Sequence, residues 1–311
     1  MSTKNLSQLP QLFRSPFLRK IAIGNYYGEL VERLELAGLN DLLTLPLANI
    51  FEGVYETLLK NYRSEYIFKN ALTQKWFLSR HSTERSYVTD EFRVGDSRVD
   101  LAVFSKTSVA FEIKTEFDSP ARLPSQSSTY MKVFDLVYVV TTDAMLPKLN
   151  GSIPKSIGIL LLGKAGGFKT ERPSESHALH TDLNLVFDCL RQPERLSIAE
   201  KNSNSKIEVP NSQIYVECKR HFRKLLPFDA QSQVVEYIRQ RPYPAATISL
   251  MEEVPKSLKH VALTLRATIQ ETKRISTELK MTPRRANSKH TKPNDDIFSI
   301  SAGEARGVVC A

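Results

Sequence analysis

Two charged residues interrupt an otherwise apolar stretch of the chain, residues 109–115, which reads VAFEIKT. Glu112 and Lys114 are two positions apart, so on a β-strand both side chains point to the same face of the sheet. A buried carboxylate and a buried ammonium group are costly unless they are paired or bound to a ligand. The spacing therefore indicates either a strand with one solvated face or a functional site.

A third charged residue, Asp100, lies in the preceding strand candidate, where we expect Val99, Leu101 and Val103 to share one face and Asp100 to lie on the other. If the two strands pair, Asp100 approaches Glu112 and Lys114 on one face of the sheet. Two carboxylates supply hard oxygen ligands of the kind that Mg²⁺ prefers. Bound Mg²⁺ polarises a phosphoryl group, and a neighbouring lysine can orient the attacking water or stabilise charge. The pattern suits a magnesium site for phosphoryl chemistry.

The spacing of an acidic residue two positions before a lysine is weak evidence by itself. It occurs four times, at Glu112–Lys114, Glu217–Lys219, Glu271–Lys273 and Glu278–Lys280. The last three lie in helical patterns, where residues two positions apart point in different directions and cannot share a site. Only the first lies on a predicted strand that follows a strand with an aspartate, so the context carries the interpretation.

The elements that would position these residues follow from the periodicity of the chain. Residues 51–80 have helical periodicity, as one long helix or two. Period-two alternation then predicts strands at 87–94, 97–104 and 108–114, followed by a helix that starts near Pro120 or Pro124, a strand at 135–142, a short helix at 143–149 and a strand at 156–163. We expect an α/β fold in which the first three strands form an antiparallel meander and the fourth returns parallel.

Four regions are predicted along the chain. Residues 1–50 form an N-terminal helical region, 51–170 the α/β core, and 171–282 a C-terminal helical region. Residues 283–311 are polar and lack periodicity, which is typical of a disordered tail.

The order of helix, three strands, helix and strand, with Asp100, Glu112 and Lys114 placed in this way, resembles the PD-(D/E)XK nuclease superfamily over about residues 54–142. Gln126 and Tyr130, in QSSTY, match the QxxxY element that follows the motif in RecB-like exonucleases. The segments RSEYIFKNAL, DEFRVGDSRVDLAVF and FEIKTEFDS resemble an uncharacterised bacterial family within that superfamily.

Two positions depart from the superfamily pattern. The first position of the PD dipeptide is Val99, so only its aspartate is kept. Pro124 precedes Gln126 by two residues, and it is compatible with a helix only if the helix begins there, which shortens the element that carries Gln126.

The resemblance implies a restriction-endonuclease-like core and a Mg²⁺-dependent deoxyribonuclease, with Mn²⁺ as a possible substitute for Mg²⁺. Its metal ligands would be Glu65, Asp100, Glu112 and the carbonyl oxygen of Ile113. Lys114 would act on the nucleophilic water, and Gln126 would position Lys114 or the substrate. Phage defence and DNA repair are the roles that this family type suggests.

Each of these residues also has a structural interpretation. Asp100, Glu112 and Lys114 could form an incidental salt bridge on a solvated face, Glu65 could pair with Lys69 one helical turn later, and the residues of the QxxxY element could belong to the helix surface or the core. The alternative function is a non-catalytic nucleic-acid-binding or adaptor protein on a degenerate nuclease fold. A third possibility is a sheet that only presents the C-terminal helices to a protein partner.

The charge of the chain favours a polyanionic partner, since its formal net charge is +9 and its sequence pI about 9.3. Residues 215–226, YVECKRHFRKLL, combine basic and aromatic side chains that could bind a phosphate backbone, although a plain amphipathic helix reads the same way. The candidate nucleic-acid contacts are Tyr130, Lys219, Arg220, Arg223 and Lys224. The helical regions could also support a homodimer or a protein partner.

The three cysteines, odd in number and without a CxxC pair, fit a reducing cytoplasm. The polar N-terminus lacks the apolar segment of a signal peptide, and no apolar run is long enough to span a bilayer. We therefore expect a cytoplasmic protein without a membrane partner.

Overall fold

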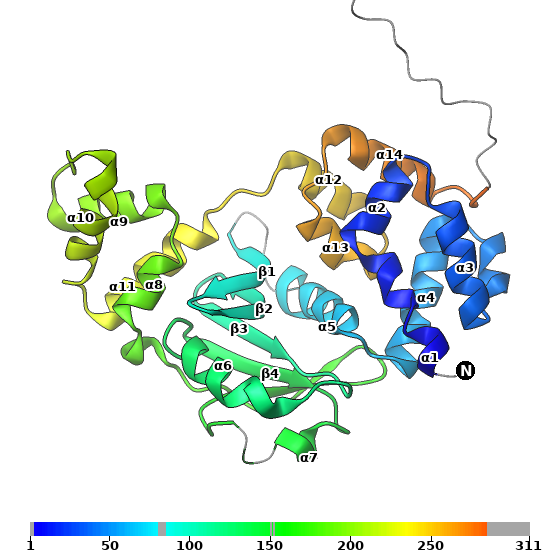
Figure 1. Cartoon of the computed structure of the whole chain (residues 1–311), viewed down its shortest axis with the longest axis horizontal. Helices are drawn as coiled ribbons and strands as arrows, with labels where there is room; N and C mark the ends of the chain where they lie inside the picture. Colours follow the sequence, from blue (N-terminus) through cyan, green and yellow to red (C-terminus); the bar gives the residue numbers. More distant parts are fainter. Residues whose placement is uncertain (1–2, 80–84, 150, 152, 285–311) are drawn as a thin grey trace, which may run out of the picture.

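A mixed six-stranded sheet lies at the centre of the computed structural model, which describes residues 3–79, 85–149, 151 and 153–284 (Figure 1). The strands are β1 (Tyr87–Val94), β2 (Ser97–Phe104), β3 (Ser108–Ile113), β4 (Leu136–Thr141), β5 (Gly158–Leu162) and β6 (Phe168–Arg172), and they lie in this order across the sheet. The first three are antiparallel, β3, β4 and β5 are parallel, and β6 is antiparallel to β5. The predicted α/β fold class, with its antiparallel meander and parallel fourth strand, is confirmed.

The edge strand β6 was missed by the sequence analysis, which predicted five strands. Its residues, FKTER, are mostly charged or polar and are largely exposed, so they lack the apolar alternation that identifies a half-buried strand. A charged edge strand discourages pairing with other chains. Because β6 ends at Arg172, the sheet extends beyond the predicted core boundary at residue 170.

The predicted helical segment 51–80 is divided in two. Helix α4 (Leu47–Asn61) ends before Tyr62, and α5 (Glu65–Leu72) continues into a π-helical segment, Thr73–Leu78. The Trp76 ring packs edge-on against Phe111 of β3, with ring centroids 5.0 Å apart. The α5 segment therefore lies directly on one face of the sheet, and its first residue is Glu65.

Helices from both ends of the chain pack together beyond α5 and share one apolar core with it and with this face of the sheet (Figure 1). They are α1 (Thr3–Leu6), α2 (Ser15–Ala22), α3 (Tyr27–Ala37), α4, α12 (Ala245–Glu253), α13 (Lys259–Thr264) and α14 (Ile269–Leu279). An ion pair joins Arg19 to Glu271 at 2.7 Å, and the Tyr26 hydroxyl donates to Glu278 at 2.9 Å. The C-terminal part of the chain thus returns to pack on the N-terminal helices.

The opposite face of the sheet is covered by a second helical layer. It contains α6 (Leu123–Tyr130), α7 (Leu146–Leu149), α8 (Leu183–Asp188), α9 (Gln192–Ser203), α10 (Asn211–Phe222) and α11 (Pro227–Arg239). Short 3₁₀ helices occur at Leu9–Phe13, Asn40–Thr44, Pro120–Arg122, Ala178–His180 and Lys256–Leu258. Among the described helices, none is both long and apolar enough to cross a membrane.

The division into regions 1–50, 51–170 and 171–282 stays a prediction. Of the predicted tail, 283–311, only Pro283 and Arg284 belong to the described residues, so the prediction of disorder lies outside them from residue 285 onward.

In the hairpin β1–β2, the regular alternation of side chains between the two faces of the sheet is interrupted at Glu91 and Asp100. The ladder skips from the pair Asp90–Leu101 to the pair Phe92–Val99, and Glu91 between them has a φ of 50°, an uncommon value for a residue other than glycine. As a result Leu101 packs against one helical layer and Val99 against the other. The expectation that Val99 and Leu101 share a face was therefore wrong, because regular alternation stops at the position of Asp100.

Gly158 gives a test of the packing between β4 and β5. A Cβ at this position would overlap the Tyr138 ring and would lie 2.7 Å from the backbone nitrogen of Ser174. We expect Gly158→Ala to lower the free energy of unfolding by about 1–3 kcal/mol, as overpacking does, in urea denaturation. Gly167→Ala, where a Cβ meets no atom within 4 Å, should change it by less than about 0.5 kcal/mol. Equal effects of the two variants would contradict the described packing.

Candidate active site

Asp100 lies where the paired strands β2 and β3 separate. Their backbone pairing runs from Phe104–Ser108 to Leu101–Phe111, and the next pair in this register would be Asp100 and Glu112. Instead, the backbone N–H of Ile113 donates to the Asp100 Oδ2 atom at 2.6 Å. The aspartate side chain thus accepts a bond from the neighbouring strand, and its carboxylate is fixed between the two strand ends.

Glu112 and Lys114 form a buried ion pair beside Asp100. The Lys114 ammonium group is 2.6 Å from Glu112 Oε1, and the two residues are only 8% and 2% exposed. Lys114 also donates to Gln126 Oε1 at 3.3 Å. Three of the predicted catalytic residues therefore form one hydrogen-bonded group, in which Glu112 and Lys114 are buried and Gln126 is half-buried.

Tyr130 lies beneath Glu112. Its hydroxyl is 3.2 Å from Glu112 Oε2 and 2.6 Å from the carbonyl oxygen of Arg98, and its side chain has no exposed surface. Burial and the nearby charge of Glu112 raise the pKa of Tyr130, so the hydroxyl stays a donor. A fully buried ring cannot contact nucleic acid in this structure. The predicted nucleic-acid contact at Tyr130 is therefore replaced by a contact with Glu112.

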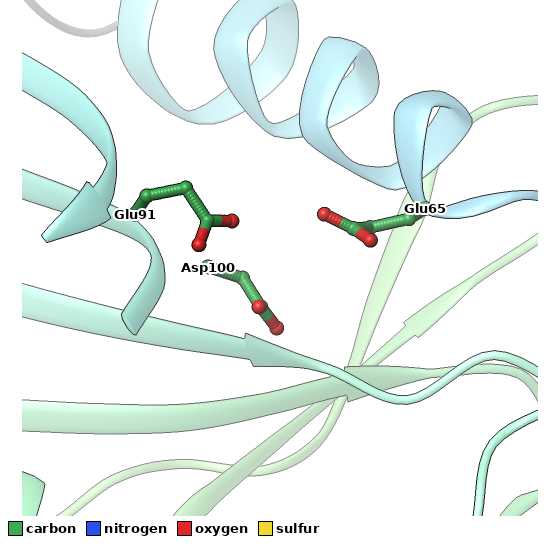
Figure 2. A group of neighbouring side chains, drawn as sticks. All are labelled: Glu65, Glu91 and Asp100. Atoms are coloured by element: carbon green, nitrogen blue, oxygen red, sulfur yellow. The ribbon is translucent and has the colours of Figure 1, made fainter. Parts of the chain in front are cut away.

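A group of three carboxylates converges on the other side of Asp100 (Figure 2). Glu65 comes from the first residue of α5, Glu91 from β1 and Asp100 from β2, and one oxygen atom of each lies within 4.8 Å of the other two. Glu65 and Asp100 were predicted ligands. Glu112 is not in this group, and a role for the Ile113 carbonyl oxygen stays a prediction.

Lys69 contacts two of the three acids in this group. Its ammonium group is 2.6 Å from Glu65 Oε1 and 3.1 Å from Glu91 Oε1, and the residue is 7% exposed. Burial alone would lower the pKa of Lys69, but the charges of Glu65 and Glu91 outweigh it and raise the pKa. The Glu65–Lys69 pair considered in the sequence analysis is thus present, and Glu65 belongs to the carboxylate group as well.

The two central carboxyl groups have raised pKa values. Burial, followed by the charge of Glu112, raises the pKa of Asp100 to about 7. Burial also raises the pKa of Glu112, although the Lys114 ammonium opposes the shift. Carboxylates whose charged forms are disfavoured in this way are stabilised when a cation joins them. The donor set, made of hard oxygen atoms only, fits a divalent ion such as Mg²⁺.

Glu91 was missed by the sequence analysis, although a signal for it existed. The two-residue turn Gly95–Asp96 places Val94 opposite Ser97, and counting back along the hairpin places Glu91 opposite Asp100. Strand register alone therefore places Glu91 beside Asp100 at the site.

A pocket of about 370 Å³ adjoins the carboxylate group from the side of the terminal helices. Its charged and titratable lining residues are Arg14, Glu65, Tyr66, Lys69, Asp90, Glu91 and His260. The His260 ring is 3.8 Å from Asp90, and its burial lowers its pKa. Two of the three grouped carboxylates, Glu65 and Glu91, therefore face this pocket together with Lys69.

The predicted basic nucleic-acid contacts lie elsewhere, on and just after α10, which Figure 1 shows at the other end of the molecule from α4. Lys219 contacts Asp188, Arg220 contacts Glu217, and Arg223 contacts Asn184. The helix ends at Phe222, so Arg223 and Lys224 follow it. Their binding to nucleic acid stays a prediction.

Asp100→Asn tests the electrostatics of the site. Folding raises the pKa of Asp100 from its ordinary value near 4 to about 7, because the folded state disfavours the charged form. The ionised Asp100 therefore lowers the free energy of unfolding of the protein as the pH rises through this range. In EDTA, Asp100→Asn should therefore stabilise the protein more at pH 8 than at pH 4.5, by on the order of a few kcal/mol in thermal unfolding. An asparagine oxygen can still accept the bond from Ile113.

Asp96→Asn, in the exposed β1–β2 turn, is the matched control and should show no such pH dependence. A stability difference for Asp100→Asn that is the same at both pH values would show that Asp100 is an ordinary ionised carboxylate.

Comparison with known proteins places the chain in one family. No curated protein and no solved structure matches it. A family model described as bacteriophage P4 protein cII matches residues 59–261, a range that includes the whole sheet, α5 and α6, and thus every residue of the candidate site. Since this match covers well over half of the chain, the protein belongs to the bacteriophage P4 cII family.

Proposed function

We propose that this protein is a metal-dependent nuclease of the PD-(D/E)XK type that hydrolyses phosphodiester bonds in nucleic acid, with DNA as the expected substrate. One observation carries the proposal. Asp100 is fixed where two strands separate, with Glu65 and Glu91 on one side and the buried pair Glu112–Lys114 on the other. A strand pair that opens onto several carboxylates and a buried lysine supplies both a cation site and a fixed positive charge.

Asp100 and Glu112 would hold the metal ion, Mg²⁺ or Mn²⁺, with assistance from Glu65 and Glu91. When bound, such an ion polarises the phosphoryl group and lowers the pKa of a coordinated water. Lys69 partly neutralises Glu65 and Glu91, and Lys114 partly neutralises Glu112, so a cation would do most for Asp100, whose charged form burial disfavours.

Lys114 would stabilise the negative charge that develops on the phosphate during hydrolysis. Its ammonium group is held by Glu112 and Gln126, so it is positioned before a substrate arrives. Tyr130 holds the other oxygen of Glu112, which limits rotation of this carboxylate. Since preorganised charges need no rearrangement at the moment of reaction, the network suits catalysis.

The rest of the molecule supports an anionic substrate. The formal net charge of +9 attracts a polyanion, which a site lined by carboxylates alone would repel. Arg14 and Lys69 line the adjoining pocket, where a phosphate could contact them.

Cleavage assays with Lys114→Met and Asp100→Asn test the proposal. Single- and double-stranded DNA and RNA are incubated with the full chain in Mg²⁺, Mn²⁺ or EDTA. We expect cleavage that requires the metal and falls by about 100-fold or more in each variant, because each loses charge stabilisation of the transition state. Lys106→Met, which removes an exposed lysine in the β2–β3 turn, should cleave like the unmodified protein.

Two outcomes of these assays would contradict the nuclease. One is the absence of cleavage of any substrate by the unmodified chain, and the other is full cleavage by Lys114→Met. Tight DNA binding without cleavage would instead favour the non-catalytic nucleic-acid-binding or adaptor protein.

Tyr130→Phe separates positioning from substrate binding. It removes the hydroxyl next to Glu112 and keeps the buried ring. We expect kcat to fall by about tenfold, as with other groups that orient a metal ligand, while DNA affinity stays unchanged. Tyr26→Phe removes the hydroxyl of another buried tyrosine, which donates to Glu278 in the terminal helices, and should change neither quantity. A loss of affinity with unchanged kcat would contradict this positioning role of Tyr130.

A further inference from the structure

Two aromatic rings stack beside the candidate site. The rings of Tyr62 and Phe117 have centroids 4.7 Å apart and an interplanar angle of 26°. Tyr62 lies three residues before Glu65, and Phe117 lies three residues after Lys114. The pair therefore joins the two chain segments that supply Glu65 and Lys114.

Phe117 is exposed in an otherwise ordered turn. Its side chain is 58% exposed, although aromatic rings of this size are usually buried. Both the backbone nitrogen and the hydroxyl of Thr115 donate to Asp118 Oδ2, at 2.8 and 2.7 Å, and the Phe117 nitrogen donates to Thr115 Oγ1 at 3.2 Å. The turn thus holds the ring in solvent at little further entropic cost when a partner binds.

The charges around the pair favour an anionic partner. Glu116 is 2.7 Å from Arg63 and also accepts from Thr142, while Asp118 accepts from Thr115, so both acids of the turn already have partners. Lys60 and Arg122 are exposed and lie within five residues of the pair along the chain. An exposed aromatic ring with exposed basic residues close to it in the chain is typical of segments that bind the bases and phosphates of a nucleic-acid strand.

We propose that Tyr62 and Phe117 form a stacking platform for an unpaired base of the nucleic-acid substrate. That the bound nucleic acid is a substrate rests on the proposed nuclease function. The platform itself requires only that a single strand of nucleic acid binds there. The three residues from Lys114 to Phe117 span at most about 11 Å. Successive nucleotides of a strand are about 3.4 Å apart, so a base stacked on Phe117 would lie within about three nucleotides of Lys114. A base inside a duplex already stacks on both faces, so the platform selects single-stranded segments or frayed ends.

Binding of labelled oligonucleotides tests the platform without any cleavage. The full chain carrying Asp100→Asn is titrated in EDTA into a single-stranded oligonucleotide and into the matching duplex, and fluorescence anisotropy is recorded. Stacking of one base contributes about 1–3 kcal/mol, so Phe117→Ala should weaken single-strand binding by about 5- to 100-fold. Binding of the blunt duplex should change by less than twofold.

Two controls accompany this titration. Phe228→Ala removes a ring on α11 that is 54% exposed and remote in sequence from the site, and it should leave both affinities unchanged. Phe117→Trp should keep the affinity, and a strand of abasic sites should bind equally weakly to the chain with Phe117 and to the Phe117→Ala variant. An unchanged single-strand affinity of Phe117→Ala, or equal losses for single strand and duplex, would overturn the platform.

These outcomes separate the platform from the nuclease. A chain that cleaves nothing can still lose single-strand affinity on Phe117→Ala, which would support the platform and contradict the nuclease alone. An active nuclease whose single-strand affinity does not change with Phe117→Ala would support the nuclease and overturn the platform alone.

Discussion

The hydrogen bond from the Ile113 backbone to the Asp100 carboxylate organises the candidate site. It is made at the point where the β2–β3 ladder stops, so one end of each strand is free to diverge. Asp100 is thereby fixed between Glu112 of β3 and the two acids contributed by α5 and β1. This bond compensates the half-buried carboxylate for part of the hydration that it loses between the strands.

The site combines four carboxylates, Glu65, Glu91, Asp100 and Glu112, with two ammonium groups, Lys69 and Lys114. When all are ionised the group carries two excess negative charges, which a single divalent cation would balance. The left-handed backbone of Glu91 adds strain of the kind that is found at functional sites. Charge imbalance and strain both lower stability, and both are accounted for if the arrangement serves binding of a cation.

Much of this arrangement could be predicted from the sequence, because hairpin register and strand alternation are local. The ranges of β1 and β2 follow from their periodicity, and the same register would have identified Glu91. The face of Val99 could not be predicted, since it depends on the positive φ of Glu91. The packing of the C-terminal helices against the N-terminal part of the chain could not be predicted either. It depends on distant contacts such as the hydrogen bond from the His260 backbone nitrogen to the Asn70 side chain, 190 residues away in the chain. The strand β6 gave no apolar signal because its residues face solvent.

Locating a bound metal ion tests the central claim most directly. Crystals of the full chain grown with Mn²⁺ and recorded at its absorption edge would show the ion by its anomalous scattering. The account predicts a peak in contact with the carboxylates of Asp100 and Glu112, with Glu65 or Glu91 as a further ligand. A site that stays without Mn²⁺, with Lys69 still paired to Glu65 and Glu91 and Lys114 still paired to Glu112, would contradict it.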